Sequence, residues 1–277
     1  MPHAVSVLRT ARLARSTKPF LARGGPHGER CAGCRLILSH CLCALRPVLP
    51  TRAGMCLIMA DTEPLKPSNT GWLIADVVPD TAAFAWARTA VDPALLAMLA
   101  DPQWQPYVVF PGEFVTRERV LIDLLPRSDN TASDANNDSN HDNQHQHAGQ
   151  HKGQAAGGKR PLFILLDATW PEARKIFKKS PYLNQFPVLS LQSGQLSRYR
   201  LRRSRRDEHF CTSEVAALCL ELAGESLAAQ TLEAYLDVFT DHYLRAKQQL
   251  KLDLEDEVHQ RLRDLRLAAN IESQSVR

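Results

Sequence analysis

Apolar residues along this chain gather in short runs, and the runs alternate with stretches that have helical spacing. The clearest run, 161–166, suits a strand that is covered on both faces of a parallel sheet. Three further strand candidates are 55–60, 106–110 and 187–191. Residues 81–99 are mostly helical in pattern, a helix is expected from Pro171 to about residue 179, and two more helices follow the last strand. Strands that alternate with helices predict an α/β fold with a parallel sheet.

Composition divides the chain into a basic N-terminal segment, one main domain and a charged C-terminal segment. Residues 1–47 hold a basic arm and four clustered cysteines, and residues 48–250 hold the α/β alternation. An insert at 128–159 is rich in Asn, Asp, His, Gln and Gly, which predicts disorder because so little apolar surface cannot offset the entropy lost on ordering. The insert joins two predicted strands, so we expect a surface excursion of one domain. Residues 251–277 are expected to form a charged helix or tail.

Length and charge restrict the class of protein only loosely. A chain of 277 residues with 44% hydrophobic content can bury one substantial core plus a small appendage. No apolar run has the length that crosses a bilayer and no secretory signal pattern occurs, so we expect a cytoplasmic protein with no membrane partner. The net charge of +4 permits an RNA partner without demonstrating one. The basic residues before Glu29 favour an arm that contacts RNA phosphates, with a cleaved transit peptide as the alternative.

Four of the seven cysteines are clustered, and they predict a structural zinc (Zn²⁺) site. They are Cys31, Cys34, Cys41 and Cys43. In a reducing compartment, four close thiols indicate a metal site more readily than disulfides, and four thiolates complete a tetrahedral zinc shell. Two alternatives stay open: reduced cysteines packed in a small core, or His40 in place of one thiolate.

The segment from Leu165 to Glu172 places a carboxylate, a hydroxyl and a tryptophan where a buried apolar run ends. Thr169 and Glu172 have the spacing of a capping box, which predicts that a helix begins there. Asp167 is therefore expected at the carboxyl end of a central strand, where open α/β sheets bind ligands. The alternative is an ordinary strand end, a helix cap and a packed Trp170.

Six arginines fall within nine residues, which is the densest basic run in the chain. They are Arg198, Arg200, Arg202, Arg203, Arg205 and Arg206. If the stretch is extended, three of them share one face and suit phosphate contacts. A solvated surface run is the alternative. Arg198 and Arg200 could instead hold the carboxylate of a cofactor by charge-assisted hydrogen bonds.

Asp167 to Trp170 form the D-x-T-W signature of the DTW-domain family, and other segments resemble that family in the expected order. These segments are 18–25, the cysteines at 31–43, 66–71, 108–112, 198–200 and 210–215. Phe110, Cys211 and Val215 depart mildly from the residues that the family usually has. The chain therefore resembles the DTW-domain family over roughly residues 16–245.

The resemblance implies an enzyme, a tRNA-uridine aminocarboxypropyltransferase. Such an enzyme transfers the 3-amino-3-carboxypropyl group of S-adenosyl-L-methionine to N3 of a uridine in tRNA, here at position 47 in the variable loop. The product is acp3U, and methylthioadenosine is released. The resemblance also implies a SPOUT-like, knotted parallel sheet flanked by helices, and it favours a monomer.

The expected site residues follow from both lines of reasoning. Asp167 is the expected catalytic residue, either as general base or as a hydrogen-bond acceptor that orients the uridine. The expected cofactor-binding residues are Pro111, Gly112, Thr169, Trp170, Thr212, Ser213 and Glu214. Trp170 would stack on adenine or uracil, Gly112 would let the main chain approach the cofactor, and residues 212–214 precede a helix whose amino end can meet a carboxylate. The expected RNA-binding residues are Arg198, Arg200, Arg202 and Arg203.

Two other functions fit part of the pattern. A zinc-knuckle RNA-binding protein without catalysis would use the same cysteines and arginines, but it leaves the D-x-T-W segment unexplained. A SPOUT-like RNA methyltransferase would use the same cofactor and transfer its methyl group. The identity of the product distinguishes the three.

Overall fold

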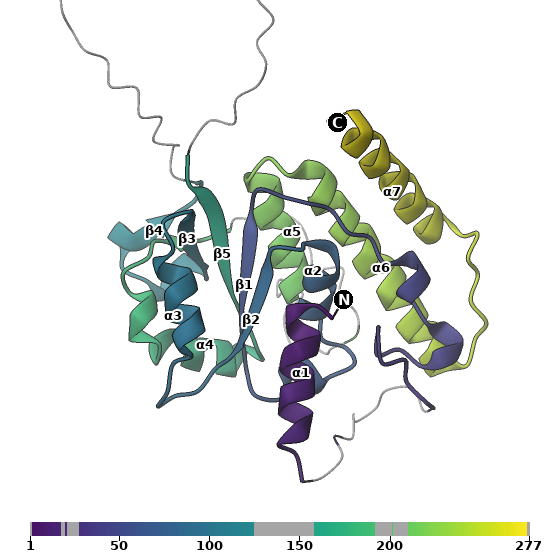
Figure 1. Cartoon of the computed structure of the whole chain (residues 1–277), viewed down its shortest axis with the longest axis horizontal. Helices are drawn as coiled ribbons and strands as arrows, with labels where there is room; N and C mark the ends of the chain where they lie inside the picture. Colours follow the sequence, from purple (N-terminus) through teal and green to yellow (C-terminus); the bar gives the residue numbers. More distant parts are fainter. Residues whose placement is uncertain are drawn as a thin grey trace, which may run out of the picture.

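The structure is a computed structural model of the chain and describes residues 2–17, 20, 28–124, 158–191, 201 and 210–275. A sheet of six strands lies at the centre of this part of the chain, and every strand pair in it is parallel (Figure 1). The order across the sheet is β2-β1-β5-β3-β6-β4. The strands are β1 (Gly54–Met59), β2 (Thr81–Ala85), β3 (Trp104–Val109), β4 (Val120–Leu121), β5 (Arg160–Asp167) and β6 (Val188–Leu189). The prediction of an α/β fold with a parallel sheet is confirmed.

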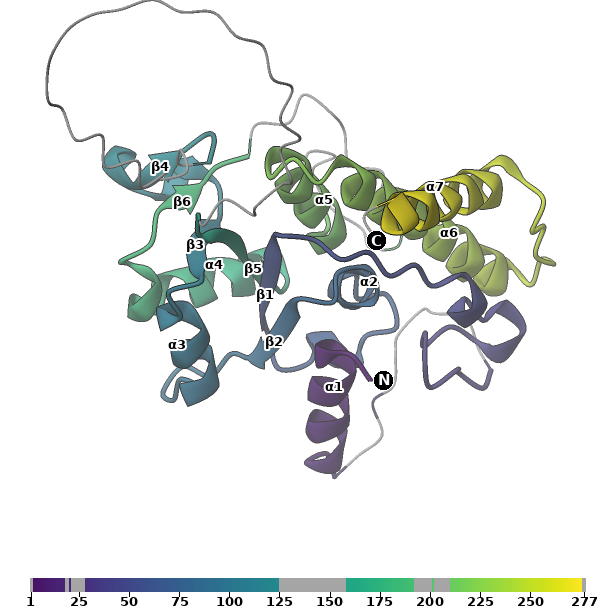
Figure 2. The same cartoon turned by 45° about the horizontal axis from the view of Figure 1, so that its top comes forward.

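Helices cover both faces of the sheet (Figures 1 and 2). The described helices are α1 (Ala4–Ala14), α2 (Gly71–Val77), α3 (Pro93–Ala100), α4 (Trp170–Lys178), α5 (Thr212–Leu222), α6 (Ser226–Gln248) and α7 (Glu257–Ser275). Short 3₁₀ helices are η1 (Leu38–His40), η2 (Cys43–Leu45), η3 (Glu63–Leu65), η4 (Gly112–Phe114), η5 (Arg117–Arg119) and η6 (Pro181–Leu183). Successive side chains of β1 enter different cores: Leu57 packs in the core with α2, α5 and α6, and Ile58 packs in the core with α3 and α4.

The strand candidates at 55–60, 106–110, 161–166 and 187–191 overlap β1, β3, β5 and β6, and α4 begins within one residue of the predicted start. The prediction of a mostly helical segment at 81–99 is wrong in its first part. Residues 81–85 form β2, which pairs with β1 from Thr81 opposite Met55 to Ala85 opposite Met59. Alanine favours helices, but pairing along an apolar strand overrides that preference. Helix α3 begins only at Pro93, where the Asp92 side chain accepts a hydrogen bond from the N–H of Ala94 at 2.9 Å.

The basic N-terminal segment is in part a helix packed on the domain. Val5 of α1 is fully buried, and the His3 ring meets the Trp72 ring edge-on at 4.4 Å between centroids. Arg12 forms a two-pronged ion pair with Asp61, with N···O distances of 2.7 and 2.8 Å. The expectation of a basic arm did not include this helix. Seven of its eleven residues are apolar, but its burial comes from contacts with residues far along the chain, which the local sequence does not reveal.

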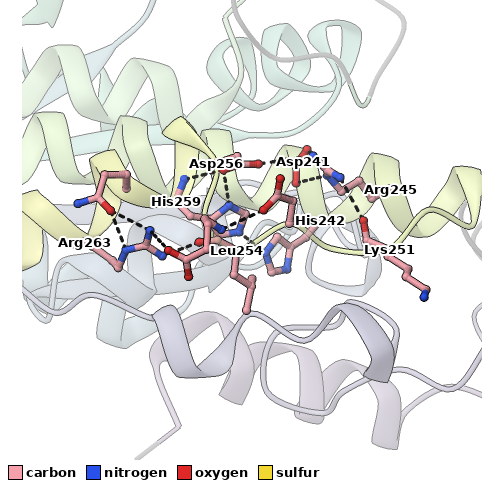
Figure 3. Close-up of polar contacts among 11 residues, drawn as sticks. Asp241, His242, Arg245, Lys251, Leu254, Asp256, His259 and Arg263 are labelled. Atoms are coloured by element: carbon pink, nitrogen blue, oxygen red, sulfur yellow. Dashed lines mark hydrogen bonds and ion pairs between the residues drawn. The ribbon is translucent and has the colours of Figure 1, made fainter.

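Helix α7 fits the predicted charged C-terminal helix, and it lies along α6 (Figures 1 and 2). Two buried histidines join these helices (Figure 3). His242 Nδ1 lies 3.1 Å from the carbonyl oxygen of His40, the Nε2 atoms of His242 and His259 lie 2.8 Å apart, and His259 Nδ1 lies 2.6 Å from Asp256 Oδ1. The two rings thus connect α6 and α7 to each other and to the carbonyl group of His40.

This arrangement predicts that the docking of α7 weakens in acid. Burial is the main reason that the pKa of His242 lies below its ordinary value of 6.5. Because the unfolded chain binds that proton more readily, stability is lost as the pH falls below about 6.5. We expect the urea midpoint of wild type to drop between pH 7.5 and pH 5, and to drop less in His242→Gln, whose amide can still bridge His40 and His259. Gln260→Ala, an exposed neighbour, should behave as wild type, and an unchanged pH dependence in His242→Gln would contradict the prediction.

Candidate functional site

Asp167 is the last residue of the central strand β5, and the fold places its side chain inside the protein. β5 is paired on both sides, with β1 and with β3, and the apolar residues before Asp167 fill both cores. Asp167 lies opposite Met59 and is only 1% exposed. The chain then leaves the sheet, and α4 begins with the capping box of Thr169 and Glu172. The carboxylate is thus at the carboxyl edge of the sheet, as predicted, but below the surface.

Both oxygens of the Asp167 carboxylate accept hydrogen bonds from neutral side chains. The Asn69 amide donates to Oδ2 at 2.7 Å, and the Thr212 hydroxyl donates to Oδ1 at 2.7 Å. A Cβ atom at Gly71 would collide with Oδ2, so the main chain of α2 approaches the carboxylate closely. Buried carboxylates are costly unless they are hydrogen-bonded, and this one is held in one orientation.

The loop that carries Asn69 is itself fixed by buried polar groups. Asn69 is fully buried, and its Oδ1 accepts a hydrogen bond from the N–H of Trp72 at 3.1 Å at the start of α2. Its amide also lies 3.5 Å from the Glu63 carboxylate, which is buried and paired with Lys66. The 66–71 segment carries part of the family resemblance, but the sequence predicted no role for Asn69 or Glu63. The pattern that could have indicated a role is a short polar stretch in the sequence between an apolar strand and an apolar helix.

The first turn of α5 completes the surroundings of Asp167. Thr212 is half-buried and contacts Asp167, so the structure brings together two of the expected site residues. The Ser213 N–H donates to the Thr70 hydroxyl at 3.3 Å, while the buried Ser213 hydroxyl has no partner among the described residues. The Glu214 carboxylate accepts from the N–H of Cys211 at 2.7 Å and caps the helix. The N-terminal end of α5 is therefore already partly occupied by the protein's own acceptors.

Trp170, three residues after Asp167, belongs to an aromatic group that packs against the core with α3 and α4. Its ring stacks on Phe110 with 5.5 Å between centroids and a 13° tilt, and Phe114 meets it edge-on at 5.6 Å. Phe110 also stacks on Phe177 at 4.3 Å. Trp170 is half-buried, so one face packs on the protein and stacking on a ligand stays a prediction for the rest of the ring.

Gly112 has a structural explanation that sequence reasoning missed. Its N–H donates to the Ser190 hydroxyl at 2.9 Å, and a Cβ atom there would lie 3.0 Å from Val120 Cγ1. The glycine thus allows η4 to pack against the ends of β4 and β6. Pro111 is exposed beside it. A close approach of a cofactor to Gly112 stays a prediction.

The four clustered cysteines come together as predicted and could bind a metal ion such as zinc. Their sulfur atoms all lie within 4.8 Å of one another, and three pairs are 3.5, 3.6 and 3.7 Å apart. Zinc–sulfur bonds of about 2.3 Å in a tetrahedron require sulfur separations of about 3.8 Å. Burial disfavours the Cys31 thiolate, but main-chain N–H groups of Cys34 and Gly33 outweigh it and lower the pKa of Cys31 to about 7. The donor set fits a tetrahedral zinc site.

His40 does not replace a thiolate. Its Nε2 lies 2.9 Å from the carbonyl oxygen of Leu250, and its Nδ1 lies 2.9 Å from the Ser39 hydroxyl. Both ring nitrogens are therefore used within the protein. A Cβ atom at Gly33 would lie 2.7 Å from Cys43 Sγ, so glycine is needed where the two halves of the cysteine centre meet.

Two predicted features lie outside the described residues. Arg198, Arg200, Arg202 and Arg203 fall in the stretch 192–209, of which only residue 201 is described, and most of the 128–159 insert falls in 125–157. Among the described helices, none combines the length and the apolar character that crossing a bilayer requires.

The family model for the DTW domain matches residues 28–244, which is more than half of the chain. The chain belongs to the DTW-domain family. No solved structure matches it. The DTW match includes the cysteine centre, the Asn69 loop, Asp167 and α5, whereas α1 and α7 lie outside it. Membership of this family is consistent with activity in tRNA modification.

Proposed function

We propose that this DTW-domain protein is a tRNA-uridine aminocarboxypropyltransferase. It transfers the 3-amino-3-carboxypropyl group of S-adenosylmethionine to N3 of a tRNA uridine, at position 47 in the variable loop. The observation that carries the proposal is the buried Asp167 carboxylate, held by Asn69 and Thr212 within the D-x-T-W segment of a DTW domain. A SPOUT-like knot, a monomeric state and a cytoplasmic location are parts of the same proposal.

The chemistry requires loss of one proton and exchange of one bond. S-adenosylmethionine supplies an electrophilic methylene carbon beside a cationic sulfur. Uridine N3 forms a bond to that carbon, the carbon–sulfur bond breaks, and the electron pair stays on sulfur as methylthioadenosine leaves. The leaving group is good, so the protein's task is to position the reactants and accept the N3 proton.

The hydrogen bonds around Asp167 support a proton path through Thr212. Asp167 is 1% exposed, whereas Thr212 is half-buried and donates its hydroxyl proton to Oδ1. The hydroxyl oxygen keeps a lone pair for a second hydrogen bond. In the proposed step, the N3 proton passes to Thr212 Oγ1 as the Thr212 proton passes to Asp167. Asn69 donates to the other carboxylate oxygen and keeps it in place.

Several described residues suit the co-substrate in chemical kind. The buried Ser213 hydroxyl next to Thr212 has no partner among the described residues and offers a hydrogen bond to a polar ligand. The half-buried Trp170 offers an aromatic surface for a base. Glu214 suits the amino group of the methionine moiety better than its carboxylate, because the carboxylate would face a like charge. The carboxylate of the methionine moiety would then be bound by an arginine such as Arg198 or Arg200. The cysteine centre would hold a structural zinc and supplies no group that touches the reacting atoms.

The small-molecule product tests the proposed function. Wild-type protein incubated with unmodified tRNA and S-adenosylmethionine should release methylthioadenosine in proportion to the modified uridine. S-adenosylhomocysteine would instead indicate a methyltransferase, and absence of both would indicate an RNA-binding protein without catalysis. Phe177→Leu, a conservative change in the packed aromatic group, serves as a control that should keep the product unchanged.

A further inference from the structure

Arg35 is a buried arginine that joins the cysteine centre to the loop of Asn69. It follows Cys34 directly and is only 2% exposed. Its guanidinium donates to two main-chain carbonyls of that loop, to Lys66 at 2.7 Å and to Asn69 at 3.1 Å. It also lies over the Trp72 ring, with 4.0 Å from Cζ to the centroid. Burial lowers the pKa of Arg35 to about 9, so the side chain is still charged at neutral pH.

The position of Arg35 is set by the cysteine centre. Its φ is 66°, a left-handed conformation that side-chain-bearing residues rarely adopt. The turn that holds it is closed by its N–H, which donates to the Cys31 carbonyl at 2.9 Å, and by Arg30, which donates to the Arg35 carbonyl at 3.0 Å. A metal ion that ties Cys31 and Cys34 together would oppose relaxation of this turn.

Packing alone does not explain a charged group at this place. The Nε atom of Arg35 is buried and has no partner among the described residues, which is a cost that an apolar side chain would avoid. The planar guanidinium can donate hydrogen bonds to two carbonyls of one loop at the same time, which an apolar side chain cannot do. Those carbonyls belong to the residues on either end of Lys66–Asn69, and Asn69 binds Asp167 directly.

We propose that Arg35 is a positioning residue that transmits metal binding at the cysteine centre to the Asp167 site. A closed centre holds Arg35, Arg35 holds the Asn69 loop, and the Asn69 amide holds the Asp167 carboxylate. The catalytic consequence rests on the proposed function, whereas the mechanical link does not. Metal loss therefore changes the geometry at Asp167 without any metal ligand reaching the site.

The test follows the side-chain amide of Asn69 by NMR in uniformly ¹⁵N-labelled full-length protein, with the signal assigned by its absence in Asn69→Asp. In wild type loaded with zinc, addition of a chelator should shift this signal. In Arg35→Met the signal should already be shifted while zinc is bound, and chelation should add little. Arg266→Met is the matched control, because Arg266 donates to the Ala44 carbonyl at 3.4 Å without reaching the Asn69 loop, and it should behave as wild type.

Arg35→Lys keeps the test decisive if Arg35→Met fails to fold. Its ammonium group keeps the charge and can donate to one of the two carbonyls but not to both. Its Asn69 signal should lie between those of wild type and Arg35→Met. In the transfer assay, Arg35→Met should lower kcat by about a hundredfold, as small misplacements do, with KM for tRNA little changed. An Asn69 signal that ignores both chelation and the Arg35 variants would overturn the proposal. An NMR response without any transfer activity would leave the link standing and reject the proposed function.

Discussion

Asp167→Asn should lower the transfer rate at saturating substrates by about a hundredfold to ten-thousandfold, the range that a positioned general base contributes. The substitution fits the buried space. The new side-chain oxygen can accept from Asn69, and the new amide can donate to the Thr212 oxygen, so we expect the fold and tRNA binding to persist. In that arrangement Thr212 becomes an acceptor from residue 167 and cannot pass a proton to it. Single-turnover kinetics with excess enzyme measures the loss at the chemical step.

Thr212 provides the matched pair of variants for this prediction. Thr212→Val removes the hydroxyl at nearly constant volume and should lose activity to a similar extent. Thr212→Ser keeps the hydroxyl and should retain most of it. Near wild-type turnover by both Asp167→Asn and Thr212→Val would remove the carboxylate and the relay from the mechanism, and solvent water or Glu214 would then be the remaining acceptor.

Cys34→Ser should release the metal and cause the largest loss of stability among these substitutions. Elemental analysis of wild type purified without added metal should find about one zinc per chain, the stoichiometry of a four-ligand site. The cysteine centre is anchored to the main core by the fully buried Leu36 and Leu42, so its collapse exposes apolar surface. We expect Tm to fall on the order of 10 °C, since each kcal/mol corresponds to about 2–4 °C in a domain of this size.

Cys219→Ala is the control for this second prediction. Cys219 is a fully buried thiol of α5 outside the cysteine centre, so the variant should keep its zinc and lose only the small packing contribution of one sulfur atom. A wild-type protein that is metal-free and equally stable with and without chelator would show that the four thiols are simply packed together.

The sequence allowed prediction of those parts of the fold that local patterns determine. The apolar run at 161–166 was predicted to be a buried strand, which β5 confirms, and the Thr169–Glu172 spacing located the start of α4 within one residue. Residues 81–85 were mistaken for helix because alanines carry no information about a strand partner, and only the pairing with β1 makes them β2. Helix α1 was missed for a related reason, since its burial depends on Trp72 and other distant residues.

The candidate site was predictable only where a motif names its residues. Asp167 and Thr212 were both chosen, although nothing in their spacing shows that residues 45 positions apart share a hydrogen bond. Asn69 lies 98 positions from Asp167, and its amide became meaningful only when the sheet brought β1 beside β5. Arg35 gave no signal either, because a single arginine after a cysteine does not reveal that its side chain turns inward.

The fate of two isotopic labels tests the central claim most directly. Unmodified tRNA is incubated with the protein and with S-adenosylmethionine that carries one label in the methyl group and another in the carbons of the amino-acid chain, and the digested nucleosides are analysed by mass spectrometry. The account predicts that the amino-acid carbons appear on a uridine while the methyl label leaves with methylthioadenosine. A methyl label on the RNA, or tRNA without either label, would contradict it.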